Sequence, residues 1–168
     1  MRRLVLATLT AAVAVSPALA AKPKVGAQYE AQVLKMTSDA IALRSVAGPG
    51  NKTPEVAQQF KAALLAGGWA DSDIEIVPLA DTAYLIATWK GSDPSLKPIV
   101  LSSHMDVVEA KPSDWVRDPF TPVVENGMLY GRGASDTKFD AVLALVSTVA
   151  LRQSGFKPKR SIVIAYSG

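Results

Sequence analysis

Two short segments carry side chains whose types and spacing could hold a divalent metal ion. Residues 102–106 (SSHMD) contain the one histidine of the sequence, His104, and a carboxylate, Asp106, follows it two residues later. Residues 131–138 (GRGASDTK) place a second carboxylate, Asp136, just after a pair of glycines. Neutral imidazole and carboxylate are both ligands that Zn²⁺ accepts. The two segments therefore indicate a zinc-type site.

The apolar pattern around these segments places them at the ends of regular elements. Residues 98–102 form a continuous apolar run, which predicts a central strand covered on both faces and ending at the histidine segment. Helical spacing of apolar residues from Asp136 onward predicts a helix that ends near Gly155, and residues 161–166 predict another buried strand. Strand, crossover helix and strand make a parallel α/β unit, whose binding groups lie at the carboxyl ends of the strands. The histidine is expected at such an end.

The remaining pattern completes an α/β fold. Helices are predicted at residues 29–43 and 53–66, and strands at residues 74–76 and 83–89. A long loop at residues 109–122 carries Trp115 and Phe120, which are expected to pack the loop rather than to bind substrate. The expected fold class is α/β, with three layers and a central, mostly parallel sheet flanked by helices.

Each candidate ligand also has a purely structural explanation. A lone histidine is commonly half-buried and serves packing. In extended chain, however, Asp106 points to the same side as His104 and can orient the imidazole ring. Asp136 could be the N-cap of the helix that follows it, although Ser135 offers the same capping oxygen.

Several other chemistries are disfavoured by the sequence. The spacing of Gly131, Gly133 and Asp136 resembles a dinucleotide loop, but a carboxylate in place of the third glycine would repel a pyrophosphate. The sequence has no Gly-x-Ser-x-Gly nucleophile turn and no cysteine. The formal net charge is only +3, and no basic cluster is interleaved with aromatic residues, so a nucleic-acid partner is not expected.

Residues 1–20 have the pattern of a secretory signal peptide. Arg2 and Arg3 form the basic start, an apolar stretch follows at residues 4–15, and residues 18–20 (ALA) make a small-residue cleavage site. The apolar stretch is shorter than the roughly 20 residues that span a bilayer, so stable membrane insertion is not expected. The mature protein is expected to begin at Ala21 and to be exported, to the periplasm or outside the cell.

Three motifs in order resemble the M20 family of zinc aminoacylases and carboxypeptidases. They are residues 102–108 (SSHMDVV), residues 115–120 (WVRDPF) and residues 127–138 (GMLYGRGASDTK). Relatives in that family include glutamate carboxypeptidase, acetylornithine deacetylase, succinyl-diaminopimelate desuccinylase and aminoacylase-1. The resemblance implies hydrolysis of amide bonds in small peptides or N-acyl-amino acids.

The resemblance also implies roles for the candidate residues. His104 would ligate one metal ion, the catalytic Asp106 would clamp its imidazole, and Asp136 would bridge two zinc ions, for which Co²⁺ or Mn²⁺ could substitute. One ion would polarise the amide carbonyl while the bridging water is activated as the nucleophile. The resemblance further implies that the Asp136–Thr137 peptide bond is cis.

In M20 members, two adjacent glutamates follow the strand equivalent to residues 161–166, and further ligands with a lid and dimerisation domain come later. Residues 21–168 are therefore expected to be an N-terminal part of the catalytic domain, inactive alone and with residues 161–166 as an aggregation-prone edge. A homodimer is expected only of a complete protein. Two alternatives stay open: a non-catalytic binding or scaffold protein of the same fold, and a metal-independent α/β binding protein.

Overall fold

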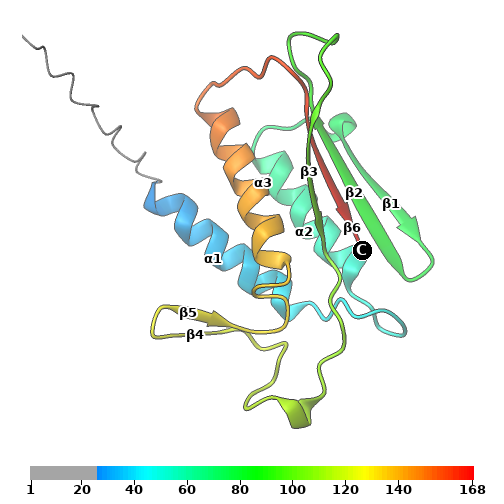
Figure 1. Ribbon diagram of the computed structural model, residues 1–168, viewed down its shortest axis with the longest axis vertical. Coiled ribbons are helices and arrows are strands. Elements are labelled where there is room, and N and C mark those ends of the chain that lie inside the picture. Colours follow the sequence, from blue (N-terminus) through cyan, green and yellow to red (C-terminus); the bar gives the residue numbers. More distant parts are fainter. Residues whose placement is uncertain (1–25) are drawn as a thin grey trace, which may run out of the picture.

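The computed structural model describes residues 26–168, which form three α-helices, a four-stranded sheet and a separate two-stranded hairpin (Figure 1). The expected signal peptide, residues 1–20, lies outside the described residues. The helices are α1 (Ala27–Ala42), α2 (Thr53–Ala66) and α3 (Lys138–Gln153). The strands are β1 (Ile74–Leu79), β2 (Thr82–Trp89), β3 (Ile99–His104), β4 (Val123–Glu125), β5 (Met128–Tyr130) and β6 (Ile162–Ser167). Two short 3₁₀ turns are η1 (Asp71–Asp73) and η2 (Pro112–Asp114).

The main sheet has the strand order β1-β2-β6-β3. β3 and β6 pair in parallel, as expected for strands joined through the crossover helix α3. β2 pairs antiparallel with both β1 and β6. The α/β class and the central sheet with packed helices are confirmed, but among the described residues the sheet is mixed rather than mostly parallel.

The helices α2 and α3 cover one face of this sheet and enclose the core. Leu85, Ala87, Ile164 and Tyr166 point to that face and are at most 1% exposed. The alternate residues of the strands, such as Ile86, point to the opposite face and are half-buried or exposed. Among residues 26–168, therefore, the sheet has its helical layer on one face, where the sequence predicted layers on both.

Two predictions about the strands are wrong. Residues 98–102 were expected to form a central strand, but β3 lies at the sheet edge, with Ile99 46% and Val100 55% exposed. Residues 161–166 were expected to form an unprotected edge, but β6 is paired on both sides, by β2 and β3. A continuous apolar run marks a strand without fixing its place in the sheet, because burial on both faces and pairing on both edges are separate properties.

Helix starts show how the local sequence sets the boundaries. α2 begins at Thr53, as predicted, and proline follows in its first turn. The Thr53 hydroxyl is a donor and does not cap the helix: the Asn51 carboxamide oxygen accepts from the Thr53 backbone N–H at 2.9 Å and from its hydroxyl at 2.7 Å. α3 begins at Lys138 with Thr137 in the N-cap position and no side-chain capping bond, so Asp136 is not the N-cap.

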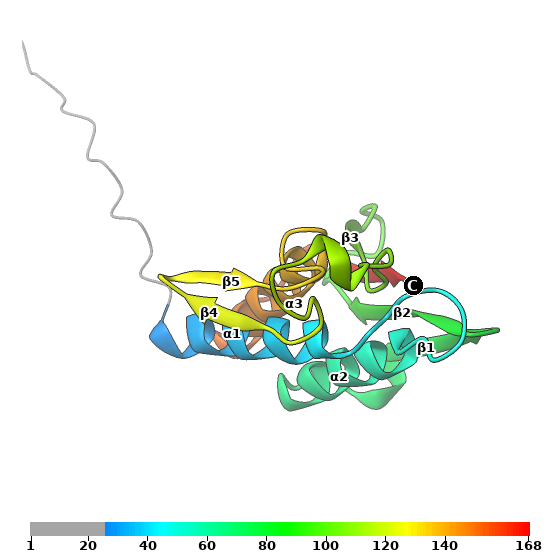
Figure 2. The ribbon, with the colours of Figure 1, turned by 90° about the horizontal axis from the view of Figure 1, so that it is seen from below.

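The hairpin β4–β5 stands apart from the main sheet. It lies beside α1 and α3, as Figure 2 shows from below, and it connects the long loop to the turn that carries Asp136. The connection from β3 to α3 therefore leaves the sheet, runs through η2 and the hairpin, and returns to the sheet at the start of α3. This return brings the two candidate segments together.

Candidate metal centre

His104 and Asp106 lie at the carboxyl end of β3. His104 is the last residue of the strand, opposite Ser167 of β6. The Met105 backbone N–H donates to the Ser167 carbonyl at 2.7 Å, which extends the pairing one step beyond the strand. The segment that presents the imidazole is therefore anchored to the centre of the sheet, as the sequence predicts for a binding group in a parallel α/β unit.

The imidazole of His104 faces one carboxylate with each ring nitrogen. Its Nδ1 lies 3.0 Å from the Asp106 carbonyl oxygen and 3.2 Å from Asp106 Oδ1. Its Nε2 lies 3.2 Å from Asp136 Oδ1. The three residues that the sequence singled out are thus brought into contact, although Asp136 is 32 residues away in the chain from His104.

These contacts constrain where the protons can be. Each ring nitrogen faces only acceptors, so a neutral ring, which carries one proton, can donate it to Asp106 or to Asp136 but not to both. When the proton is on Nδ1, Nε2 presents a lone pair to the Asp136 carboxylate, which is also only an acceptor. Two facing acceptors are stable together when a cation lies between them, either a proton on the ring or a metal ion.

The spacing of these two atoms suits a metal ion. Zinc binds histidine nitrogen and carboxylate oxygen at about 2.0–2.1 Å in tetrahedral geometry, which puts two ligand atoms about 3.3–3.4 Å apart. The Nε2–Oδ1 separation of 3.2 Å is close to that edge length. The Asp136 side chain is 83% exposed, so its second oxygen is free to serve another ion. Within residues 26–168, no group of three or more histidine, cysteine or acidic side chains is arranged so that all of them could hold one metal ion.

The turn that carries Asp136 is tightly packed beneath the carboxylate. A Cβ atom on Gly131 would lie 2.6 Å from Ile41 Cγ2, and one on Gly133 would lie 3.0 Å from both Val107 Cγ1 and the Lys138 side chain. Gly133 also has φ +92°, which favours glycine. The Asp136–Thr137 peptide bond is cis, so the expectation from the family resemblance is confirmed.

The sequence did not single out two buried polar residues near the site. Lys138 is fully buried, and its Nζ donates to the carbonyl oxygens of Ala40 at 2.6 Å and Leu43 at 2.9 Å. Burial lowers the pKa of the Lys138 amine to about 8, while the Asp106 carboxylate opposes that shift. Ser45 is also fully buried and donates to the Met105 carbonyl. A lysine in a first helical turn and a serine after a helix are ordinary in sequence, so no signal distinguished them.

The long loop is held by two arginines. The Arg132 guanidinium stacks over Trp115 at 5.2 Å, and its backbone N–H donates to the Pro119 carbonyl at 2.7 Å. Arg44 lies over the Phe120 ring at 5.8 Å and forms an ion pair with Glu109. Both aromatic side chains therefore make packing contacts, as expected from the sequence.

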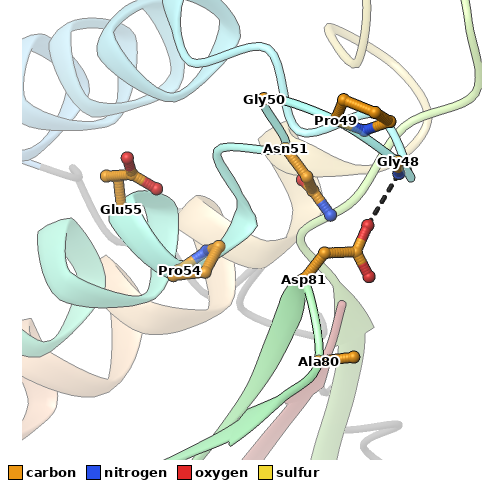
Figure 3. A pocket seen from close by; sticks show the side chains of 8 residues that line it. All are labelled: Gly48, Pro49, Gly50, Asn51, Pro54, Glu55, Ala80 and Asp81. Atoms are coloured by element: carbon orange, nitrogen blue, oxygen red, sulfur yellow. Dashed lines mark hydrogen bonds between the residues drawn. The ribbon is translucent and has the colours of Figure 1, made fainter.

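Two hollows lie outside this cluster. One, of about 710 Å³, is lined by residues 48–51, Pro54 and Glu55 at the start of α2 and by the Asp81 turn (Figure 3). The other is an apolar groove of about 1250 Å³ between α1, α3 and the β4–β5 hairpin. Neither is lined by His104, Asp106 or Asp136. No helix among the described residues has the length and apolar character needed to cross a membrane.

Comparison with known families and sequences supports the family resemblance. The model of peptidase family M20/M25/M40 matches residues 100–168, which include all three candidate residues. A probable carboxypeptidase S-like 2 from Dictyostelium discoideum is 42% identical over 83 residues, or 49% of this chain and 16% of that protein. The mouse N-fatty-acyl-amino acid synthase/hydrolase PM20D1 is 44% identical over 78 residues, or 46% of this chain and 16% of the relative.

Solved structures agree on the fold. An M20 family metallo-carboxypeptidase from Sulfolobus solfataricus aligns with a TM-score of 0.68 at 22% identity, covering 82% of this chain and 30% of its own. Human carnosine dipeptidase 1 aligns with a TM-score of 0.62 at 24% identity, covering 84% of this chain and 32% of its own. The matched part of this chain spans about one sixth of the length of the sequence relatives. The resemblance to the M20 family that the motifs indicated is thus confirmed.

Proposed function

We propose that this M20-family chain contributes to the catalytic domain of a metal-dependent hydrolase that cleaves amide bonds in small peptides or N-acyl-amino acids. The observation that carries the proposal is the contact between two possible metal ligands, His104 Nε2 and Asp136 Oδ1, 3.2 Å apart within the family-matched segment. The printed functions of the relatives, carboxypeptidase and N-fatty-acyl-amino acid hydrolase, support the choice of bond.

In the proposed mechanism, the residues of this chain would hold the metal ions and orient the His104 ring. His104 Nε2 and Asp136 Oδ1 would be ligands of Zn²⁺, and the second Asp136 oxygen would reach a second ion. Bound metal of this kind polarises the amide carbonyl and lowers the pKa of a water nucleophile. Asp106 accepts the Nδ1 proton of His104, which keeps the ring in the tautomer whose Nε2 lone pair is free for a metal. Co²⁺ or Mn²⁺ would serve in place of zinc.

The general base and the remaining metal ligands belong, in this proposal, to the segment that follows β6 in complete members of the family. β3 and β6 run parallel, and β6 ends beside His104 in the register. Acidic residues directly after β6 would therefore enter the site from the same edge of the sheet as His104 and Asp106. The activity proposed here is that of the whole protein, including such a segment and a lid domain that would close over the substrate.

Export and dimerisation complete the proposal. Residues 1–20 would direct export to the periplasm or the cell exterior and would be removed before Ala21. Mass spectrometry of the exported protein tests this directly, because an intact Met1 or a membrane-retained product would exclude cleavage. A homodimer of the whole protein is expected, and light scattering would detect it.

The central experiment measures amino-acid release by the full-length gene product. Purified protein is offered dipeptides and N-acyl-amino acids, with and without chelator, followed by restoration with Zn²⁺. Turnover that chelator abolishes and zinc restores supports the proposal. Turnover that resists chelator would overturn the assignment of a metallohydrolase, and metal binding without turnover of either substrate class would favour a binding or scaffold role.

A further inference from the structure

The two halves of the candidate metal centre come from different elements and meet at the end of α1. His104 and Asp106 follow β3, whereas Asp136 lies in the turn before α3. Residues 40–45, the end of α1 and the chain that follows it, contact both halves. Their contacts are made mostly by groups that are fully buried.

Lys138 ties the Asp136 turn to this end of α1. Its Nζ donates to the Ala40 and Leu43 carbonyl oxygens at 2.6 and 2.9 Å. The last carbonyls of a helix lack partners within the helix, and the helix dipole favours a cation there. Ile41 adds a packing contact, because the missing Cβ of Gly131 leaves room for its side chain. The turn is thus held by a charged anchor and by close packing.

Ser45 ties the other half to the same segment. Its hydroxyl donates to the Met105 carbonyl at 2.8 Å, and its own carbonyl accepts from the Val107 N–H at 2.8 Å. These two bonds bracket Asp106 and directly follow His104. Residues 40–45 are thus tied to the Asp136 turn through Lys138 and to the segment after His104 through Ser45.

We propose that Lys138 and Ser45 are positioning residues that set the separation between His104 and Asp136 through the end of α1. Neither side chain is hydrogen-bonded to His104 or Asp136. A metal site loses affinity when its ligands are displaced by about 0.5 Å, so anchors that fix their separation affect binding directly. The link to metal binding rests on the proposed function, whereas the ligand separation itself does not.

The test compares two variants with one matched control in the full-length protein. Ser45→Ala removes a buried hydroxyl that donates to a carbonyl at 2.8 Å. Thr148→Val removes an equivalent hydroxyl, which donates to the Ala144 carbonyl at 2.7 Å within α3. Lys138→Met keeps most of the length of the side chain and removes its charge and both hydrogen bonds. Co²⁺ affinity and the visible Co²⁺ spectrum are measured for each protein, together with its unfolding in urea.

We expect Lys138→Met to weaken Co²⁺ binding by about 10–100-fold, the range typical of residues that support metal ligands. Ser45→Ala should weaken it by a smaller factor and change the Co²⁺ spectrum. Thr148→Val should alter neither, whatever its effect on urea unfolding. If Lys138→Met fails to fold, Ser45→Ala against Thr148→Val decides the matter. A folded Ser45→Ala protein with wild-type Co²⁺ affinity and spectrum would overturn the proposal.

A second measurement separates this proposal from the proposed function. Crystal structures of the metal-free wild type, Ser45→Ala and Thr148→Val proteins give the His104–Asp136 separation without reference to activity. If the wild type binds no Co²⁺, the proposed metal chemistry fails, while a changed separation in Ser45→Ala alone would still support positioning. An unchanged separation in Ser45→Ala would refute positioning even in a protein that binds metal.

Discussion

Two glycine-rich turns in this chain precede a helix, yet they have opposite surroundings. Residues 48–51 (GPGN) lead into α2, and residues 131–137 (GRGASDT) lead into α3. A Cβ atom on Gly48 or Gly50 would meet no atom within 4 Å. A Cβ atom on Gly131 or Gly133 would press on Ile41, Val107 or Lys138.

Each turn also involves one carboxylate, Asp81 beside the first turn and Asp136 within the second. Asp81 accepts a hydrogen bond from the Gly48 backbone N–H at 2.7 Å, an ordinary loop contact at the surface (Figure 3). Asp136 instead faces Nε2 of His104, which offers it no donor when the neutral ring carries its proton on Nδ1. At the first turn, the carboxylate already accepts a hydrogen bond from the backbone. The second turn is held by close packing against its glycines. Its carboxylate stays available for a cation, which is what a metal centre requires.

The largest difference is expected from removing these two carboxylates. Asp136→Ala should abolish turnover and reduce bound metal in parallel, because the residue would serve both ions. Asp81→Ala should leave turnover unchanged and lower the free energy of unfolding by about 0.5–1.5 kcal/mol, the net value of one hydrogen bond. Metal analysis, amino-acid release and urea unfolding of the full-length variants measure all three. Full activity in Asp136→Ala would contradict the proposed site.

The next largest effects on turnover are expected at the other two residues of the candidate metal centre. Asp106→Ala should lower turnover by about 10–100-fold, the usual loss when a residue that orients a metal ligand is removed. His104→Ala should fall between that loss and the complete loss in Asp136→Ala, since one ion keeps its other ligands. The measurement is turnover at saturating Zn²⁺. An Asp106→Ala protein less active than His104→Ala would reverse the assigned roles of ligand and orienting residue.

The sequence singled out the candidate site residues but not the residues that support them. A histidine and carboxylates spaced so that they could hold a metal ion are an uncommon combination. His104, Asp106 and Asp136 could therefore be singled out by type and spacing. Lys138 and Ser45 could not, because a lysine or serine is ordinary until the fold brings it against buried carbonyls. The prediction of a cis peptide bond after Asp136 rested on the family resemblance alone.

The strand errors have a similar physical origin. Residues 98–102 and 161–166 are both apolar runs, and periodicity finds both strands. Which of them lies at the edge depends on hydrogen-bond partners distant in sequence, such as the antiparallel pairing of β2 with β6. The exposed face of the sheet likewise depends on where helices pack. Local pattern therefore gives elements and their order, whereas sheet position follows from long-range pairing.

A smaller effect should separate the two turns by stability. Gly50 has φ +79° and Gly133 has φ +92°, so alanine at either position incurs the left-handed backbone cost of about 1–2 kcal/mol. Gly133→Ala should lose roughly 1–3 kcal/mol more from overpacking, because its Cβ would also press on Val107 and Lys138. Urea unfolding of the two variants gives the difference. Equal losses would show that the second turn has room to relax.

The smallest effect concerns Asp118, whose turn in the long loop is open to solvent like that of Asp81. The Thr121 hydroxyl, at 2.7 Å, and the Phe120 N–H, at 3.0 Å, hold the pKa of Asp118 below its ordinary value. Thr121→Val should therefore raise the pKa of Asp118, as followed by an NMR titration.

The sign of the pH dependence follows from that shift. Because the folded pKa of Asp118 is the lower one, its contribution to stability is present above the unfolded pKa, about 3.9, and is lost as pH falls through the folded pKa. The stability difference between wild type and Thr121→Val should accordingly shrink in acid. Ser95→Ala is the control, since Ser95 makes the same kind of contact with Asp93 in another loop. It should raise the pKa of Asp93 and leave that of Asp118 unchanged, and a shift of both would mean that the two open turns are coupled through the fold.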